Sequence, residues 1–363
     1  MKIDIDSIDP INFLVNEHVL NGEVVYLVQP QHQGCSWNQS NKIFRSSVWN
    51  FDGELISVGF PKFTNWGENP EHFPLPNSLS NASIVNKLDG SLLIVSKYKN
   101  QFIIRTRGTI DATRLDNGHE LVHFNPILEK LKTFNDNETW GFSFLFEWLS
   151  PTNVIVINYG DVPQFKLIGK IFHEDGRLCN QTDLDVIAAQ YDIDRPEKYS
   201  FSDIDEMIAA VSGWKDLEGV VVYSKNDQFL HKIKAETYLK LHRFKSNATF
   251  ENTVELFFEY GMPDYVTFRE QLVAHFDWEC FNMIQGFLSD ICDGYKEVLK
   301  IVEGMKNFLE NNKNLSRKDL AMKVFSSYGG ENNNRASFVF TLKDRGELNK
   351  DQLKKLLFQV TKK

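Results

Sequence analysis

The chain is poor in cysteine and has no long apolar run. Its four cysteines, Cys35, Cys179, Cys280 and Cys292, form no Cys-x-x-Cys pair, so the 363-residue sequence predicts neither a disulfide framework nor a cysteine-based zinc site. No apolar stretch approaches membrane-spanning length, and the first residues are too acidic for a signal peptide. We therefore expect a protein of the reducing cytosol with no membrane partner.

Basic residues are also fewer than acidic residues. The chain has 40 Lys and Arg against 49 Asp and Glu, which gives a formal net charge of −9. A nucleic-acid partner would therefore have to be bound by a local basic surface rather than by the overall field of the protein. The length suggests two domains, or one large domain with an appendage.

Many short strands with few helices between them predict an α+β domain with antiparallel sheets in the first two thirds of the chain. Asp52-Gly53 and Lys99-Asn100 are predicted turns between neighbouring strands. Helices are expected at residues 125–132 and after the N-caps Thr182 and Ser202. The predicted strands are residues 23–28, 43–49, 55–58, 92–96, 102–106, 142–148, 154–157, 165–171, 219–223 and 229–234.

The pattern changes near Ser246, where helical periodicity replaces the short strands. Alternating steps of three and four between apolar residues predict a long amphipathic helix from Phe281 onward. Three glycines, Gly286, Gly294 and Gly304, would weaken this helix. The apolar positions are 281, 284, 288, 291, 295, 298, 302, 305 and 309.

Two further helices are expected in this last part, with Ser316 and Asn349 as their N-caps. We therefore divide the chain into an α+β domain at residues 1–246 and a separate all-helical domain at residues 247–363. The helical domain has local basic residues, which could contact phosphates or could be solvated helix faces. These are Arg317, Lys318, Lys323, Lys343, Arg345, Lys354, Lys355, Lys362 and Lys363.

The stretch Lys87-Leu88-Asp89-Gly90-Ser91 lies between two apolar runs, residues 83–86 and 92–95. Buried strands on both sides would place its lysine at the mouth of a strand pair, held by rigid backbone. That position suits a nucleophilic amine, whose pKa has to be lowered by its surroundings before it can attack. The alternative is a hairpin corner with a solvated lysine.

Other charged residues are placed where they could bind one ligand. Lys232 and Lys234 are two apart on a predicted strand, so both leave the same face and suit a polyphosphate, unless that face is simply exposed. Glu218 precedes Gly219 and an apolar strand; it could hold Mg²⁺ or be a surface residue. Glu147 lies in an aromatic strand, where it needs a partner such as a ribose hydroxyl or a basic side chain.

In this order, these motifs resemble those of the covalent nucleotidyltransferases: DNA ligases, RNA ligases and mRNA capping enzymes. The nucleophile motif of that superfamily matches Lys87-Leu88-Asp89-Gly90. Its second and third motifs match Arg107-Gly108 and Phe146-Glu147. The fourth and fifth match residues 217–221 and 232–234.

Within the superfamily, the chain is most similar to the phage-type RNA ligase 1 family of tRNA-repair ligases, over residues 43–245. Lys-x-Asp-Gly-Ser-Leu is that family's form of the nucleophile motif, and DNA ligases usually carry Arg where this chain has Leu92. Arg45 and the segment Pro61-Lys62-Phe63-Thr64-Asn65 resemble the Arg and Lys-Phe-Phe-Asn elements of the family. Because threonine replaces the second Phe, Phe63 and Trp66 both remain candidates for the aromatic residue near the nucleotide.

The resemblance implies an ATP-dependent RNA ligase that joins 5′-phosphate and 3′-hydroxyl RNA ends in RNA repair. The reaction would pass through a lysyl-AMP enzyme and an adenylylated 5′ RNA end, with ATP and Mg²⁺ or Mn²⁺ as cofactors. A monomer that acts on RNA such as broken tRNA is implied, in the host cytoplasm if the protein is phage-encoded. The helical domain, residues 247–363, would then be an RNA-specificity module.

The resemblance also implies a role for each matched residue. Lys87 would attack the α-phosphorus of ATP, Glu218 would bind the metal, and Glu147 would bind the ribose. Nucleotide-binding positions would be Arg45, Lys62, Phe63, Asp89, Gly90, Arg107, Glu147, Lys232 and Lys234.

Two alternatives remain at this point. The first is a DNA ligase or a capping-type guanylyltransferase, although those enzymes usually append an OB-fold rather than a helical tail. The second, of a different class, is a catalytically silent RNA-binding relative, against which the intact lysine motif argues.

Overall fold

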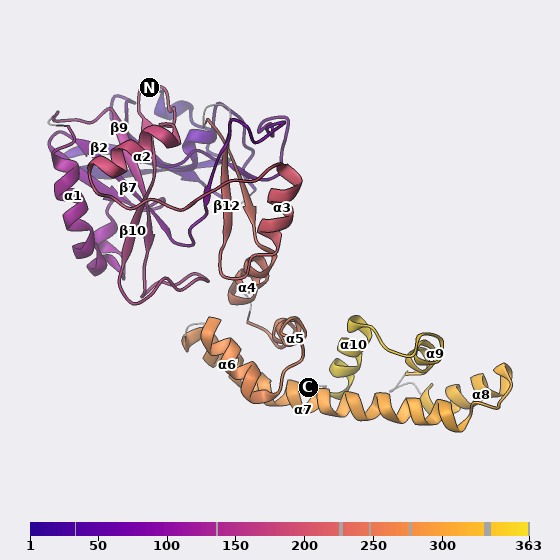
Figure 1. Ribbon diagram of the computed structural model, residues 1–363. Helices are drawn as coiled ribbons and strands as arrows, with labels where there is room; N and C mark the ends of the chain where they lie inside the picture. Colours follow the sequence, from indigo (N-terminus) through magenta and orange to yellow (C-terminus); the bar gives the residue numbers. More distant parts are fainter. Residues whose placement is uncertain are drawn as a thin grey trace. The chain divides into compact units, whose positions relative to one another are not determined.

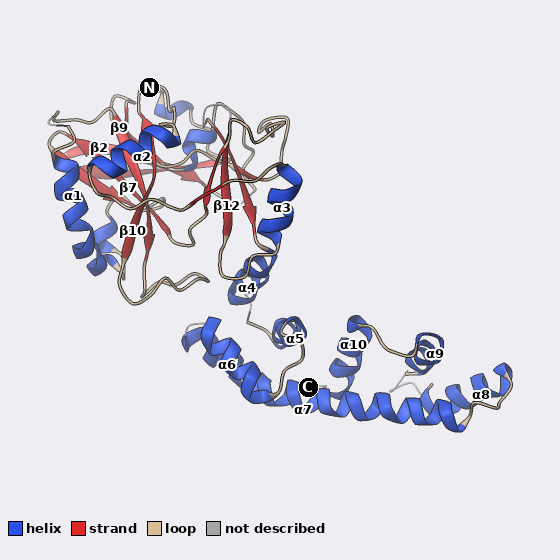
Figure 2. Ribbon diagram, in the orientation of Figure 1, coloured by secondary structure: helices blue, strands red, loops and turns tan. Residues whose placement is uncertain are grey.

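The computed structural model describes residues 1–32, 34–135, 137–224, 228–246, 248–275, 278–329 and 335–361. The chain divides into two compact units, Met1–His242 and Arg243–Lys363 (Figure 1). In the part of the chain that the structure describes, strands lie in the first unit, and the second unit is built of helices (Figure 2).

Three sheets form the first unit, and their strands pair antiparallel except β13 with β5. The first sheet has the order β1 (Phe13–Leu20), β2 (Glu23–Pro30), β3 (Ser47–Asn50), β4 (Leu55–Val58). The second has the order β10 (Gln164–Phe172), β9 (Phe142–Leu149), β7 (Ser91–Tyr98), β8 (Gln101–Arg105). The third has the order β11 (Lys198–Tyr199), β6 (Ser83–Asn86), β12 (Gly219–Ser224), β13 (Phe229–Lys234), β5 (Thr64–Asn65). The α+β class with antiparallel sheets is thus confirmed.

Helices of the first unit cover these sheets. Contacts join α2 to β10 and α3 to β12 and β13. Asn180 and Asp203 are the N-caps of α2 and α3, so the predicted caps, Thr182 and Ser202, were wrong by one or two residues. The helices are η1 (Ile5–Ser7), η2 (Lys42–Arg45), η3 (Ala112–Arg114), η4 (Gly118–Phe124), α1 (Asn125–Lys132), α2 (Gln181–Gln190), α3 (Ile204–Ser212) and α4 (Glu236–Ser246).

The predicted turns and the first helix are confirmed. Gly53, between β3 and β4, has φ +74°, a conformation that glycine adopts without strain. Lys99 and Asn100 both have positive φ between β7 and β8, as a tight hairpin turn with the correct twist requires. Helix α1 spans the same residues as predicted.

One predicted strand began too early, one did not form, and three strands were missed. Residues 43–45 belong to the 3-10 helix η2, so β3 begins only at Ser47. Residues 154–157 form no strand, because the N–H groups of Val156 and Ile157 donate to the Asp89 carboxylate instead of to a sheet. Strands β1, β5 and β11 were not predicted.

The segment around Lys87 is not the mouth of a strand pair. Strand β6 pairs with β11 and β12, whereas β7 pairs with β8 and β9, so the chain passes from the third sheet to the second. One apolar core joins the two sheets here and includes Val85 of β6, Ile94 of β7 and Leu145 of β9. Residues 87–90 are therefore anchored to two sheets at once.

The second unit is organised by helix α7, which continues through its three glycines. Contacts join α5, α6, α9 and α10 to α7, and α8 to α9. The predicted caps are confirmed: Ser316 caps α8, and Asn349 forms a capping box on α10. These helices are α5 (Phe250–Glu259), α6 (Tyr265–His275), α7 (Trp278–Asn311), α8 (Arg317–Tyr328), α9 (Ala336–Arg345) and α10 (Lys350–Val360). Among the described residues, no helix is both long enough and apolar enough to cross a bilayer.

The three glycines of α7 differ in their surroundings. A Cβ at Gly294 would lie 2.4 Å from Thr361 Cγ2 and 3.0 Å from Leu357 Cδ1, so α10 approaches α7 closely at this point. A Cβ at Gly286 or Gly304 would meet nothing within 4 Å. Only Gly294 therefore has a packing reason to be glycine.

We predict that Gly286→Ala and Gly304→Ala each stabilise the helical unit by about 0.5–1 kcal/mol, because alanine loses less backbone entropy in a helix. Gly294→Ala should bring no gain or a loss, because the methyl group displaces α10. Urea unfolding followed by circular dichroism measures all three variants. An equal gain at the three positions would contradict the described packing of α10 against α7.

Candidate active site

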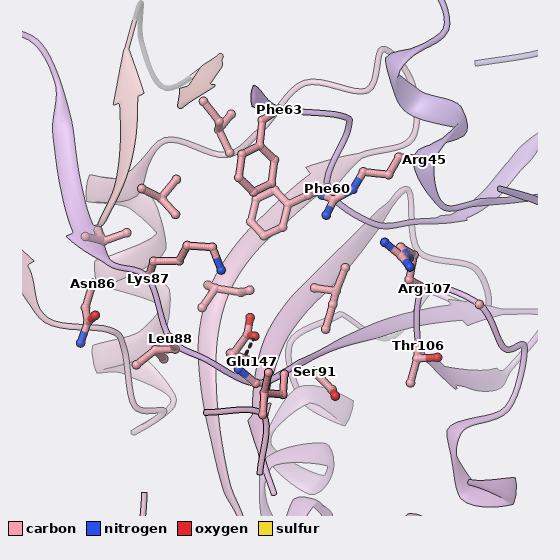
Figure 3. Close-up of a pocket in the computed structure, with 18 of the residues that line it drawn as sticks. Arg45, Phe60, Phe63, Asn86, Lys87, Leu88, Ser91, Thr106, Arg107 and Glu147 are labelled. Atoms are coloured by element: carbon pink, nitrogen blue, oxygen red, sulfur yellow. Dashed lines mark hydrogen bonds between the residues drawn. The ribbon is translucent and has the colours of Figure 1, made fainter. Parts of the chain in front are cut away.

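A pocket of about 640 Å³ lies in the first unit where the second and third sheets meet (Figure 3). It contains six of the predicted site residues: Arg45, Phe63, Lys87, Gly90, Arg107 and Glu147. Figure 3 shows the Lys87 side chain entering from one side and Arg45 and Arg107 from the other. Apolar side chains that sequence reasoning missed complete the lining, among them Phe60, Ile155, Ile168, Val221, Tyr223 and Leu230.

Lys87 is held by a buried carboxylate. Glu218 is only 2% exposed, and its Oε1 lies 2.8 Å from Lys87 Nζ and 2.8 Å from Lys234 Nζ. The backbone fixes the same groups: Lys87 N–H donates to Gly219 O, and Ala235 N–H donates to Glu218 O. Because a buried carboxylate needs compensating charge, each lysine stabilises Glu218 and is positioned by it.

Glu147 lies in the pocket wall and accepts a hydrogen bond from Gly90 N–H at 3.1 Å. This backbone group is the partner that the sequence required but did not identify. Burial raises the pKa of Glu147 to about 7; Lys87 opposes the shift, and the carboxylates of Glu218 and Asp89 add to it. The carboxyl group is thus partly protonated near neutral pH.

Cations gather around Phe63. The Arg45 guanidinium lies 5.0 Å from the ring centroid, and Lys232 Nζ lies 5.6 Å from it. Burial lowers the pKa of Arg45 to about 10, with a further contribution from Arg107. Together these groups form the local basic surface that the acidic chain needs to bind an anion.

Lys232 is affected by the whole basic cluster. Burial, together with the charges of Arg45, Lys234, Lys87 and Lys62, lowers its pKa to about 8. Lys62 itself is outside the pocket lining. Its Nζ lies 5.8 Å from the centroid of the Trp37 ring. Bringing a phosphate into the cluster would relieve this repulsion.

Of the two aromatic candidates, Phe63 lines the pocket and Trp66 does not. Phe63 packs edge-on against Phe60, with ring centroids 6.1 Å apart, and both line the cavity. Trp66 instead packs against His231 and belongs to the core under α3. The choice that the sequence left open is thereby settled for the pocket wall.

Asp89, predicted to bind the nucleotide, is not among the lining residues and is 4% exposed. Its Oδ2 accepts from the N–H groups of Val156 and Ile157 at 2.7 and 2.9 Å, and its Oδ1 accepts from Tyr238 Oη at 2.7 Å. Asp89 N–H in turn donates to Tyr159 Oη at 3.0 Å. The residue joins the nucleophile segment to two distant parts of the chain.

Sequence reasoning missed both of these tyrosines. Burial raises the pKa of Tyr238, which keeps its hydroxyl protonated as the donor to Asp89. No short motif surrounds either Tyr238 or Tyr159, because their partner lies far away in the sequence. One signal could have indicated them: a buried aspartate needs several hydrogen-bond donors, and tyrosine hydroxyls can supply them.

Two glycines of the matched motifs, Gly90 and Gly219, are required because neighbouring backbone atoms leave no room for a Cβ. A Cβ at Gly90 would lie 2.5 Å from Trp148 O, and one at Gly219 would lie 1.9 Å from Ile233 O. Gly219 also has φ +146°, which other residues rarely adopt. The close approach at both positions is therefore made by neighbouring strands.

A divalent metal would depend on a small donor set. The described residues include no group of three or more His, Cys, Asp or Glu side chains arranged to bind one. Glu218 and Glu147 are the carboxylates next to Lys87. One or two carboxylates with substrate phosphates and water are the usual ligands of Mg²⁺, so the residues present fit a metal that binds together with a polyphosphate.

A family model described as RNA ligase matches residues 41–239. A bifunctional polynucleotide kinase/RNA ligase of Autographa californica nuclear polyhedrosis virus is 27% identical over 227 residues, 56% of this chain and 30% of that protein. An RNA ligase of Rhodothermus phage RM378 is 25% identical over 316 residues, 70% of this chain and 72% of that protein. The match thus spans under a third of the baculovirus protein and most of the phage one.

Solved structures are similar at low identity. An archaeal ATP-dependent RNA ligase is 14% identical, with a TM-score of 0.46 over 82% of this chain and 76% of its own. A Naegleria gruberi RNA ligase variant with ATP and Mn is 13% identical, with a TM-score of 0.41 over 67% of this chain and 84% of its own.

The raised pKa of Glu147 predicts how Glu147→Gln changes stability with pH. Below about pH 4.5 the carboxyl is neutral in both folded and unfolded chains, so the amide should be nearly equivalent. Between about 4.5 and 7 the unfolded chain loses this proton more readily than the folded one, so the parent's free energy of unfolding falls relative to the variant's. Above about pH 7 the difference between the free energies of unfolding of parent and variant should be constant. Urea unfolding of parent and variant across this pH range tests the prediction. A gap between their free energies of unfolding that shrinks as the pH rises would contradict the raised pKa of Glu147.

Proposed function

Because the chain belongs to the RNA ligase family, whose model matches residues 41–239, we propose that it is an ATP-dependent RNA ligase that joins 5′-phosphate and 3′-hydroxyl ends. The observation that carries this proposal is the Lys87–Glu218–Lys234 cluster beside a pocket with further cations and an aromatic wall. A silent binding protein would have no need for an amine held by a buried carboxylate at the pocket edge.

The reaction consists of three displacements at phosphorus. Lys87 Nζ attacks the α-phosphorus of ATP, a P–N bond forms, and pyrophosphate leaves. The 5′-phosphate of RNA then displaces lysine to give an adenylylated end, and a 3′-hydroxyl finally displaces AMP. Such steps depend mainly on positioning and charge neutralisation.

Lys87 has to lose its proton before it can attack. Glu218 Oε1, at 2.8 Å, orients this amine, and Lys234 at the same oxygen helps to compensate the charge of the carboxylate. When bound, Mg²⁺ or Mn²⁺ would be held by Glu218 and phosphate oxygens and would neutralise charge at the reacting phosphorus.

The remaining residues bind the adenine base, the ribose or the phosphates of ATP. Phe63 and the apolar lining form the surface for adenine, and Glu147 receives a ribose hydroxyl. Arg45 and Lys232, which both lie near the Phe63 ring, bind the phosphates together with Arg107, and Lys62 extends this surface. Asp89 and Gly90 act through the backbone, by fixing the segment that carries Lys87.

The helical unit is proposed to select the RNA, broken tRNA being the implied substrate, with the protein acting as a cytoplasmic monomer. Its basic residues are not equivalent. Lys354 pairs with Glu255, and Lys323 donates to Asn312, so both are used inside the unit. Lys362 and Lys363 lie outside the described residues. The basic residues left to meet RNA are Arg317, Lys318, Lys343, Arg345 and Lys355.

Lys87→Ala should abolish the covalent label formed from α-labelled ATP and a divalent metal, because it removes the attacking amine. Lys166→Ala is the matched control: this lysine also forms a 2.8 Å ion pair, with Asp194, but lies outside the pocket lining, and the variant should label like the parent. Lys87→Ala should still seal pre-adenylylated RNA, whereas Glu218→Ala should fail in both assays.

Chase of the label distinguishes the alternatives. Transfer of AMP to 5′-phosphorylated RNA supports an RNA ligase, whereas preferential transfer to DNA, or labelling by GTP, would indicate one of the other nucleotidyltransferase classes. A parent protein that takes no label at all would refute the enzymatic proposal.

A chain ending at Ser246 should label at close to the full-length rate but lose preference for structured RNA over a generic strand. The pocket residues all lie at or before His242, and the truncated chain keeps α4 with its Tyr238–Asp89 hydrogen bond. Labelling rate and competition between two RNAs are the measurements. A folded truncated chain that takes no AMP would place part of the catalytic unit in the tail.

A further inference from the structure

Arg105 at the end of β8 is fully buried, with 0% exposure, and does not line the pocket. Within the described residues, no carboxylate lies within ion-pairing distance of it. Its guanidinium instead makes four hydrogen bonds to uncharged groups. Nε donates to Ser57 Oγ at 2.8 Å; Nη1 donates to Ser46 Oγ at 2.7 Å and Thr106 O at 3.0 Å; Nη2 donates to Ser46 O at 3.2 Å.

Burying a guanidinium without a counter-charge is costly. The same desolvation lowers the pKa of Arg105 to about 9. An apolar residue at this position would avoid the cost, so the hydrogen bonds must supply something that packing cannot. Their partners show what this is, because they lie next to the two arginines of the pocket.

Ser46 links the two arginine segments. It follows Arg45 directly, and its Oγ donates to Arg107 O at 3.0 Å while accepting from Arg105. Its carbonyl accepts from Arg105 and from Gly59 N–H at 2.8 Å. One planar guanidinium therefore fixes the backbone after Arg45 and, through Ser46 and Thr106, the backbone around Arg107.

Arg105 is itself anchored by a row of buried serines. Ser57 accepts from Ser96 at 2.8 Å; Ser96 and Ser143 are 2.8 Å apart; and Ser143 lies 2.8 Å from His173 Nε2. Burial lowers the pKa of His173 to about 3, so the ring is neutral. Each serine hydroxyl has one proton to donate. Because Ser96 donates its proton to Ser57, Ser96 must accept from Ser143. Ser143 in turn must accept from His173 Nε2–H. This row crosses β4, β7 and β9 and gives Arg105 a rigid support.

We propose that Arg105 is a positioning residue that holds Arg45 and Arg107 side by side as one binding site for a polyphosphate. The two pocket arginines repel each other, as the effect of Arg107 on the pKa of Arg45 shows. Without a fixed backbone they would separate. The nature of the ligand, the triphosphate of a nucleotide, rests on the proposed function, whereas the positioning itself rests on the hydrogen bonds.

The test is binding of inorganic tripolyphosphate, and of ATP without metal, measured by calorimetry on the full chain. Arg105→Met should bind both roughly tenfold more weakly, the size of effect seen when an outer-shell partner of a binding residue is lost. Arg105→Lys should recover part of this, because an ammonium still reaches some of the acceptors but cannot reproduce the planar fork.

Arg195→Met is the matched control. Arg195 also makes a set of short hydrogen bonds, to Leu167 O, Gln181 Oε1 and Asp185 Oδ1, but it does not line or support the pocket. Its variant should bind like the parent. Thermal unfolding of each variant shows that the chain is folded.

In a background of Arg45→Ala with Arg107→Ala, Arg105→Met should weaken binding no further, since it acts only through those two residues. The same tenfold loss in that background, or unchanged binding by Arg105→Met alone, would overturn the proposal. Tripolyphosphate binding that depends on Arg105 in a protein that takes no label from ATP would support the positioning role and refute the ligase.

Discussion

The site depends on one buried carboxylate shared by two lysines. Glu218 can occupy its position only because Lys87 and Lys234 compensate its charge, and the lysines can approach each other only because Glu218 lies between them. Strand pairing fixes the arrangement: Gly219, with its positive φ, lets β12 start against the carbonyl of Ile233 in β13. Lys87, the proposed nucleophile, is thus held by sheet geometry rather than by its own loop.

The pocket is a positive site in an acidic protein because cations reach it from four parts of the chain. Lys87 follows β6, Lys232 lies in β13, Arg45 ends η2, and Arg107 follows β8. These elements are far apart in the sequence, so the positive field is assembled by the fold and cannot be read from the net charge. Local concentration of cations, not overall balance, decides which anion binds.

The sequence predicted those parts whose signal is local. Alternating strands, the turn at Lys99 and the capping box at Asn349 each depend on neighbours within a few residues. Residues 154–157 have a β-branched composition like that of a strand, yet their N–H groups bond to Asp89, 67 residues earlier. Asp89 was in turn predicted as a ligand-binding residue, because a motif records that a carboxylate is required without recording what it contacts.

Binding of a polyphosphate and attack by a lysine amine set opposite requirements on protonation near neutral pH. Glu147, with a pKa of about 7, and Lys232, with a pKa of about 8, are both protonated below pH 7, so the pocket is then most positive and best suited to hold a polyphosphate. Attack on phosphorus, however, needs an amine that has given up its proton, which a rising pH favours. A lower pH therefore favours binding of the polyphosphate, whereas a higher pH favours attack by the amine. Glu218 fixes the position of the Lys87 amine beside these cations, which in the proposed reaction would hold the phosphates.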